Sequence, residues 1–404
     1  MSSDPLGSAR LRLFSFADQA AFSLANFLVT LAAARLFRDQ DLAGYGLGVS
    51  AAVILQSVQR MTLVVPAALL NDSRFSRRAP GLVGQQLMEL GAVLALAASA
   101  LPVVSAFPVY HIAVLAGMSS SLVFMSIDFD RALLLRFGYH SMPMLMSGAY
   151  VVCVAGLVVF GWSHRISFAG LLVGQGVFGV LKTCCSVSLT VRPNLRHGLR
   201  TVLYNLRRNT GWPTVGTLAS TSYVHLPLFI LSANGSPLVA AAFVATRTPI
   251  QPLLVLIRSL DIVDKLRHGS RSGNSSDVRK HFYQTLRLYG LVSMAFALIA
   301  SVFAPTLLTI LVGPKFAPFW PLLVVWSLVF VLTNAVLPME TVIYSQRNVR
   351  SYALVQVGGA VVALLSAAPL IALLGAGGAV LACLGGWVFA IGGAWMLARE
   401  AIAL

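Results

Sequence analysis

The sequence predicts an all-α polytopic membrane protein with about twelve transmembrane helices in two six-helix lobes. Three observations lead to this fold class. Of the 404 residues, 57% are hydrophobic and only 10% are charged, whereas a soluble domain carries about 25% charged residues. Apolar stretches of the length that spans a bilayer, roughly 20 residues, recur along the whole chain. The net charge of +16 comes from Lys and Arg residues that gather in the polar segments between these stretches.

The first lobe is expected over residues 1–186. Basic residues precede its first apolar stretch, as they do in a signal peptide. However, Asp18 and Gln19 interrupt the apolar run and no small-residue cleavage site follows, so we expect a retained helix. The six stretches of this lobe cover residues 12–34, 42–66, 84–106, 108–127, 143–162 and 166–186.

The second lobe is expected over residues 212–404, after a polar linker at 187–211. Short linkers at 232–235 and 374–377 indicate tight helical hairpins. Residues 264–284 are rich in Gly and Ser, which is typical of a flexible link. The six stretches of the second lobe cover residues 212–232, 236–259, 285–312, 318–343, 352–374 and 377–398.

The basic residues predict the topology. Most of the 29 Lys and Arg residues fall on one side of the membrane when both termini are cytoplasmic. One missed helix would invert every later loop, so this bias supports the helix count. The sequence therefore predicts a multi-pass membrane protein with both termini in the cytoplasm. The positive charge is explained by orientation, which argues against a nucleic-acid partner.

The linker at 187–211 is open to two interpretations. Leu199, Leu203 and Leu206 alternate with Arg200 and Arg207 at helical spacing. This pattern is typical of a basic amphipathic helix on the inner membrane surface. A solvated linker would have a similar composition, and both alternatives stay open.

Arg247 is the clearest candidate for a functional residue inside the membrane. It lies near the middle of the eighth stretch, where an ionisable side chain costs at least a few kcal/mol. Pro249 and Pro252 follow it, with Gln251 between them, and are expected to break the helix. The freed backbone carbonyls must then line a cavity or pack against protein. We interpret this segment as a cationic, interrupted binding site; an Arg paired with a carboxylate to hold helices together is the alternative.

Further candidates lie in the first, second and eighth stretches. Asp18 is a candidate site for a coupling cation or proton, with a polar clamp to Arg60 or to another helix as the alternative. Asn26 lies on the same broad face of the first stretch and is a candidate substrate contact. Arg60 and Arg258 lie close to the inner membrane boundary, where they either anchor the topology or line a gate.

The sequence holds no pattern typical of catalysis or metal binding. Ser/His/Asp, HExxH and Walker patterns are absent, and the seven His and four Cys residues have no metal-ligand spacing. We therefore expect neither an enzyme nor a bound cofactor or metal.

The two halves of the sequence share a weak similarity in the spacing of their residues. The second stretch opens with residues 43–46 and has Arg60 fifteen positions after Tyr45, while the eighth stretch has Arg258 fifteen positions after Phe243. These are corresponding helices of a six-plus-six arrangement. Parallel repeats related by a pseudo-two-fold axis along the membrane normal are typical of transporters, with the substrate site at the midplane between the halves.

Several motifs resemble one known superfamily. Residues 17–28, 34–36 and 43–46 resemble the opening of bacterial polysaccharide flippases of the multidrug/oligosaccharidyl-lipid/polysaccharide exporter superfamily. Residues 313–316, 344–347 and 375–379 resemble the second lobe of the same family, and the helix count and loop pattern agree along the whole chain.

The resemblance implies a V-shaped helical transporter that flips a lipid-linked oligosaccharide across the inner membrane by alternating access. Members of the family often place Arg residues in the central cavity to meet the pyrophosphate. Arg247 matches that kind of position, and Arg60 and Arg258 match it less closely. The sequence departs from the family pattern in its first helix, which carries Asp18 and Asn26 rather than Arg.

Three function hypotheses follow. The first is a flippase for an undecaprenyl-type lipid-linked oligosaccharide, with a polymerase and glycosyltransferases of the same pathway and membrane lipids as partners. The second is a multidrug or small-molecule exporter of the same superfamily, although a cation exporter would favour acidic cavity groups over Arg247. The third is a membrane polysaccharide polymerase, which would need catalytic groups at a sizeable outer loop; the outer loops of this chain are short.

Overall fold

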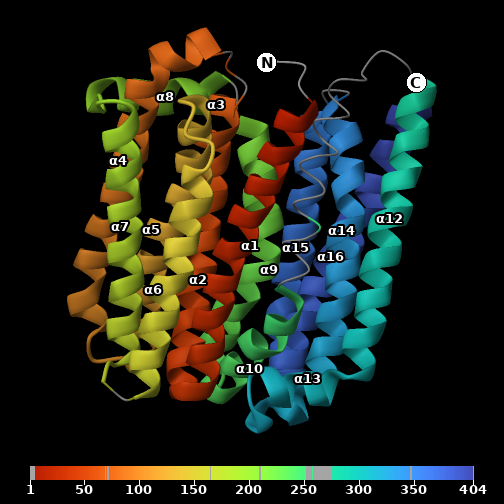
Figure 1. Cartoon of the computed structure of the whole chain (residues 1–404). Helices are drawn as coiled ribbons and strands as arrows, with labels where there is room; N and C mark the ends of the chain where they lie inside the picture. The colour runs from red at the N-terminus through yellow and green to blue at the C-terminus, as the bar shows by residue number, and fades with distance from the viewer. Residues whose placement is uncertain are drawn as a thin grey trace. The chain divides into compact units, whose positions relative to one another are not determined.

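The chain folds entirely into helices over the part of it that the structure describes (Figure 1). The structure is a computed structural model that describes residues 5–68, 70, 72–163, 165–208, 211–251, 257, 275–345 and 348–403. Over those residues, 11 helices are long and apolar enough to cross a membrane, and a shorter apolar helix covers Pro237–Ile250. The predicted all-α polytopic fold class is confirmed. The chain divides into two compact units, Met1–Thr214 (unit 1) and Val215–Leu404 (unit 2).

Unit 1 contains the six helices expected for the first lobe and an additional helix. The second spanning helix ends in a π-helical turn, η1 (Arg60–Val64), followed by the short α3 (Val65–Ala68). The other helices are α1 (Pro5–Leu36), α2 (Asp39–Gln59), α4 (Asp72–Val104), α5 (Pro108–Arg136), α6 (Met142–Trp162), α7 (Phe168–Thr190) and α8 (Leu195–Arg208).

The third spanning helix begins earlier than the sequence predicted. It was expected from residue 84, but α4 starts at Asp72 because its first turns are amphipathic. Arg74, Arg77 and Arg78 are exposed on one side of these turns, and Phe75 is buried on the other. A window that searches for uniformly apolar residues misses such a half-polar extension.

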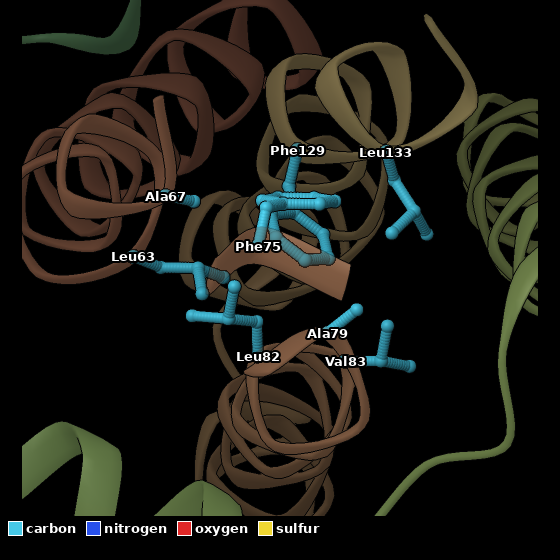
Figure 2. Packing of buried hydrophobic residues seen from close by; sticks show 8 residues of the cluster. All are labelled: Leu63, Ala67, Phe75, Ala79, Leu82, Val83, Phe129 and Leu133. Atoms are coloured by element: carbon cyan, nitrogen blue, oxygen red, sulfur yellow. The ribbon is translucent and has the colours of Figure 1, made fainter. Parts of the chain in front are cut away.

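A cluster of buried hydrophobic side chains explains why the polar start of α4 is held in place (Figure 2). The rings of Phe75 and Phe129 lie next to each other at its centre. Arg136 places its guanidinium over the Phe75 ring, 4.7 Å from the centroid, and donates a hydrogen bond to the Leu70 carbonyl at 2.6 Å. The cluster joins η1, α3, α4 and α5 through Leu63, Ala67, Phe75, Ala79, Leu82, Val83, Phe129 and Leu133.

The fourth spanning helix is longer than predicted. We expected it to end at residue 127, but α5 continues to Arg136. Phe129 and Leu133 are buried against α4, and the charged residues between them lie on other faces of the helix. The prediction was wrong because it ended the helix at a run of charged residues, whereas these residues lie on a helix that packs within unit 1.

Close backbone contact between α2 and α5 depends on two glycines. A Cβ atom on Gly44 would lie 2.5 Å from the Val109 carbonyl oxygen, and one on Gly48 would lie 2.4 Å from the Ala113 carbonyl oxygen. Only a residue without a side chain fits at these positions. Gly44 belongs to the 43–46 motif, so part of that motif has a packing role.

The polar linker after α7 forms a helix, α8, at one end of unit 1 (Figure 1). It packs on α4, where Gly84 and Gly198 allow the two backbones to touch. Leu195, Leu199 and Leu203 remain exposed along one face. The helix that the amphipathic interpretation requires is therefore present, and its position on a membrane surface stays a prediction.

Unit 2 contains the helices expected for the second lobe, and two of the predicted spans are interrupted. The span predicted at 236–259 changes from an α-helix to a 3-10 turn after Arg247. The predicted span 285–312 is divided at Phe303, because Pro305 lies in the first turn of the next helix and cannot donate a hydrogen bond to a continuing one. The elements are α9 (Gly211–Asn234, which starts in unit 1), α10 (Pro237–Arg247), the 3-10 turn η2 (Thr248–Ile250), α12 (Ser275–Val302), α13 (Ala304–Leu311), the 3-10 segment η3 (Pro314–Phe319), α14 (Trp320–Ser345), α15 (Val349–Leu374) and α16 (Ala376–Ala403).

Helix contacts within the two units follow a common plan. In unit 1 the fourth spanning helix, α5, packs against α2, α4 and α7. In unit 2 the fourth, α14, packs against α10, α12 and α16, which occupy the same places in chain order. This agreement supports the internal repeat that the sequence showed only weakly.

Candidate functional site

The interior of unit 1 contains an ion pair between helices that are distant in sequence. Arg131 of α5 donates from Nε to one carboxylate oxygen of Asp18 in α1, and Ser147 of α6 donates from Oγ to the other oxygen. The Arg131 and Asp18 side chains are only 14% and 2% exposed. Asp18 was predicted to couple transport or to clamp the first helix to another one, and the structure contains such a clamp, to Arg131.

A second carboxylate, Asp128, lies at the edge of this pair. Its Oδ1 is 3.8 Å from Nη1 of Arg131, one helical turn away on the same face of α5. Its Oδ2 is 3.5 Å from Nε2 of Gln56 in α2. The Asp128 side chain is 23% exposed, so it is less deeply enclosed than Asp18.

A third carboxylate, Asp130, faces α7 and is 1% exposed. Neither of its oxygens accepts a hydrogen bond from the described residues, and Oγ1 of Thr183 is likewise buried without a partner there. Lys182 on α7 is also buried and interacts electrostatically with Asp130. We call Asp18, Asp128, Asp130, Arg131 and Lys182, with Ser147 and Thr183, the charge cluster.

The sequence did not predict the charge cluster. Residues 128–131 lie beyond residue 127, where the fourth stretch was expected to end, and Lys182 was not among the candidate site residues. The signal that could have found it is the spacing of Asp128 and Arg131 with Phe129 and Leu133, which puts charges and apolar residues on different faces of one helix.

Asn26 lies in a polar chain through the same unit. The Tyr150 hydroxyl donates to Oδ1 of Asn26 at 3.2 Å and accepts from Nε2 of Gln175 at 2.8 Å. Tyr150 is 1% exposed, and Phe22 and Phe178 stack on its two sides. Asn26 therefore connects α1 to α6 and, through Tyr150, to α7.

Arg60 opens the π-helical turn at the end of α2 and is exposed. The preceding residue, Gln59, is buried and donates to Oε1 of Gln86 at 2.6 Å and to the Met125 carbonyl at 2.9 Å. A π-helical turn inside a helix is rare and is often found at functional sites. The turn directs Arg60 away from the buried amides next to it.

In unit 2, Arg247 is the last residue of α10, where the α-helix gives way to η2. Its guanidinium carbon lies 5.4 Å from the centroid of the Trp326 ring in α14. Phe243, one turn earlier, packs edge-on against the same ring, with centroids 5.0 Å apart. The neighbouring Thr246 and Thr248 donate their hydroxyls to carbonyls of their own helix, so Arg247 is the charged group of this break.

Of the other residues predicted for this segment, two are described by the structure and two are not. Pro249 is buried in η2, and Gln251 follows it at intermediate exposure. Pro252 and Arg258 lie outside the described residues.

Unit 2 also holds a buried polar and aromatic group that the sequence did not predict. The Tyr223 hydroxyl of α9 donates to Oε1 of Gln356 in α15 at 2.6 Å, and its ring packs edge-on against Trp387 of α16. Glu340 of α14 interacts electrostatically with Tyr223 and with Tyr352. Over the described ranges, no three His, Cys, Asp or Glu side chains are placed to hold a metal ion.

Solved structures of similar fold cover nearly the whole chain. A multidrug resistance MATE family transporter of the MOP superfamily, in an inward-facing conformation, matches with a TM-score of 0.68 and 16% identity over 95% of this chain and 94% of its own. The lipid II flippase MurJ, in an inward closed conformation, matches with a TM-score of 0.72 and 10% identity over 97% and 89%. A MOP superfamily transporter from Pyrococcus furiosus, described as having a binding pocket of reverse polarity, matches with a TM-score of 0.54 and 15% identity over 98% and 95%.

Neither a protein-family model nor a curated protein sequence matches the chain. Identities of 10% to 16% show the fold and not the substrate. The chain thus has the fold of MOP superfamily transporters, the superfamily that its motifs resemble. The neighbours in fold are themselves transporters.

Proposed function

We propose that this protein is a transporter of the bacterial inner membrane that flips an undecaprenyl-type lipid-linked oligosaccharide by alternating access. Two findings support the proposal. The fold is similar to that of the lipid II flippase MurJ over 97% of the chain. The observation that carries the proposal is Arg247, a cation at the end of an interrupted apolar helix.

Arg247 has the properties that an anionic headgroup requires. Guanidinium groups bind phosphate oxygens through two parallel N–H donors, and the attraction is stronger in a low-dielectric interior than in water. The Trp326 ring packs beside Arg247 and is itself buried, so it helps to hold the guanidinium in place. In this proposal Gln251, Asn26, Arg60 and Arg258 add further polar or basic contacts along the route of the substrate.

Asp18 remains our candidate for the coupling residue. Its carboxylate holds Arg131 and Ser147 together across three helices. A proton that neutralised Asp18 would remove the ionic contact to Arg131 and loosen α1 from α5. The proposed protein has no catalytic step, and a polymerase and glycosyltransferases of the same pathway would supply and consume its substrate.

The Arg247→Ala variant tests the proposal. The full-length protein is reconstituted into liposomes that contain an undecaprenyl pyrophosphate-linked oligosaccharide with a fluorescent sugar, and flipping is followed by quenching from outside. We expect the variant to flip at least about tenfold more slowly, because a charge-assisted contact to phosphate contributes about 1.5–3 kcal/mol. Arg247→Lys should keep part of the rate, since it keeps the charge and loses the paired donors.

The matched control is Arg399→Ala, an exposed Arg near the end of α16. It should flip the lipid at the wild-type rate. Wild-type flipping by Arg247→Ala, with normal insertion into the membrane, would refute the role of Arg247.

A multidrug exporter is the second candidate. The similar fold of a MATE family transporter favours it. Efflux of cationic dyes from the same liposomes separates the two candidates. Dye efflux without any flipping of the lipid-linked sugar would replace the first proposal by the second.

A further inference from the structure

The charge cluster of unit 1 contains two kinds of buried carboxylate. Asp18 has a direct ionic partner, Arg131, and a hydrogen-bond donor, Ser147. Asp130 lacks both: its two oxygens are enclosed and form no hydrogen bond of full geometry with the described residues, although the Thr183 and Ser186 hydroxyls interact with the carboxyl. An ionised carboxylate without compensation inside a protein costs several kcal/mol, so a buried Asp130 is either neutralised by a proton or compensated by a positive charge nearby.

Lys182 is the group that supplies this charge. It is 7% exposed and lies on α7, which packs directly against α5. Its electrostatic partners are Asp130 first, and then Asp18, Arg131 and Asp128. Among the described residues Lys182 forms no salt bridge within 4.0 Å, so its interaction with Asp130 is electrostatic and without direct contact.

The charges of the enclosed part of the cluster balance without an added ion. In their ionised forms Asp18 and Asp130 contribute two negative charges, and Arg131 and Lys182 contribute two positive ones. Asp128 is the most exposed member and reaches a polar partner in Gln56. Oγ1 of Thr183, buried and unpartnered beside Lys182, is an oxygen of the type that binds a small hard cation.

We propose that Asp130 and Thr183 form a latent site for a monovalent cation, and that the ammonium of Lys182 serves there as a built-in counter-ion. Unit 1 therefore keeps its buried carboxylates compensated without Na⁺ or K⁺. Removing the ammonium opens the site, and a soluble cation from solution then takes its place. This inference goes beyond the proposed function, because it does not depend on what the protein carries.

The test compares the thermal stability of the purified full-length protein in NaCl, KCl and choline chloride at equal ionic strength. The wild type should unfold at the same temperature in all three salts. Lys182→Ala should unfold several degrees lower in choline and regain that loss in NaCl or KCl. A second measurement is direct binding of radioactive Na⁺, which should be absent in the wild type and present in Lys182→Ala.

Three variants serve as controls. Lys182→Arg keeps the charge and should remain insensitive to the salt. The double variant Asp130→Asn/Lys182→Ala lacks both charges and should fold and also remain insensitive. Lys280→Ala removes an exposed lysine of α12 and should behave as the wild type.

Each remaining outcome would overturn the proposal. A wild type that binds Na⁺ or is stabilised by Na⁺ or K⁺ already uses a free cation. A Lys182→Ala protein with the same stability in all salts has no latent site. If Lys182→Ala fails to fold in every salt while the double variant folds, no soluble cation can replace the ammonium.

Discussion

Asp18 and Arg131 illustrate how single residues hold unit 1 together. Their ion pair is buried, and Ser147 satisfies the second oxygen of the carboxylate. Buried pairs of this kind contribute little net stability, but a charge left alone by the loss of its partner is strongly destabilising. The same reasoning applies to Asp130 and Lys182, where the pairing is less direct.

We predict that Arg131→Met lowers the stability of the protein by about 3–5 kcal/mol, since it leaves the buried Asp18 without its ionic partner. Asp18→Asn should cost less, because Asp128 still lies 3.8 Å from Arg131. The double variant Asp18→Asn/Arg131→Met should lose clearly less than the sum of the two. Thermal unfolding in detergent measures all three. Losses that simply add would show that the two side chains do not act as a pair.

The elements show why polar runs in this sequence were hard to interpret. The last turns of α5 carry Asp128, Asp130 and Arg131, yet the helix continues because Phe129 and Leu133 pack against α4 on its other face. The first turns of α4 follow the same rule, with arginines outside and Phe75 inside. Both segments are helices whose polar face depends on a neighbouring helix.

Contact between α4 and α8 depends on glycine, because the two backbones touch at Gly198. A Cβ atom on Gly198 would lie 2.6 Å from the Gln85 backbone nitrogen and 2.7 Å from the Gly84 carbonyl carbon. These are backbone atoms of another helix, and they cannot move aside as a flexible side chain would. The two helices must separate if residue 198 gains a side chain.

Gly198→Ala should therefore destabilise unit 1 by about 1–3 kcal/mol, the usual cost of overpacking. The matched control is Gly91→Ala in α4, where a Cβ atom would meet nothing within 4 Å. This control should be neutral or stabilising by up to about 1 kcal/mol, because Ala favours a helix more than Gly does. Equal unfolding temperatures for both variants would contradict the close contact of α4 and α8.

On the scale of the whole molecule, the fold relates the chain to a class of transporters, and the charge distribution predicts its orientation in the membrane. The comparisons show the fold of MOP superfamily transporters over nearly the whole chain. The orientation in the membrane is predicted from the distribution of the basic residues alone. The repeated contacts of α5 and α14 with their neighbours agree with two halves that share a common order of helices.

We predict that both termini lie in the cytoplasm. Alkaline phosphatase, which is active only outside the cytoplasm, should be inactive when fused after the last residue of the chain. It should be active when fused within the linkers at 232–235 and 374–377. A fluorescent protein that folds only in the cytoplasm should give the reverse pattern at the same positions. Phosphatase activity at the C-terminus would contradict the predicted topology.

The sequence by itself predicted the membrane class, the positions of most spans and the position of Arg247 within an apolar segment. These are local properties, because roughly 20 apolar residues form a spanning helix whatever lies around them. It could not predict the end of α5 or the charge cluster. Asp18 and Arg131 are 113 residues apart in sequence, and Asp130 meets Lys182 only because α5 packs on α7. Only the tertiary structure decides which charges are enclosed together, since the free energy of a buried charge depends on the partner that packing brings to it.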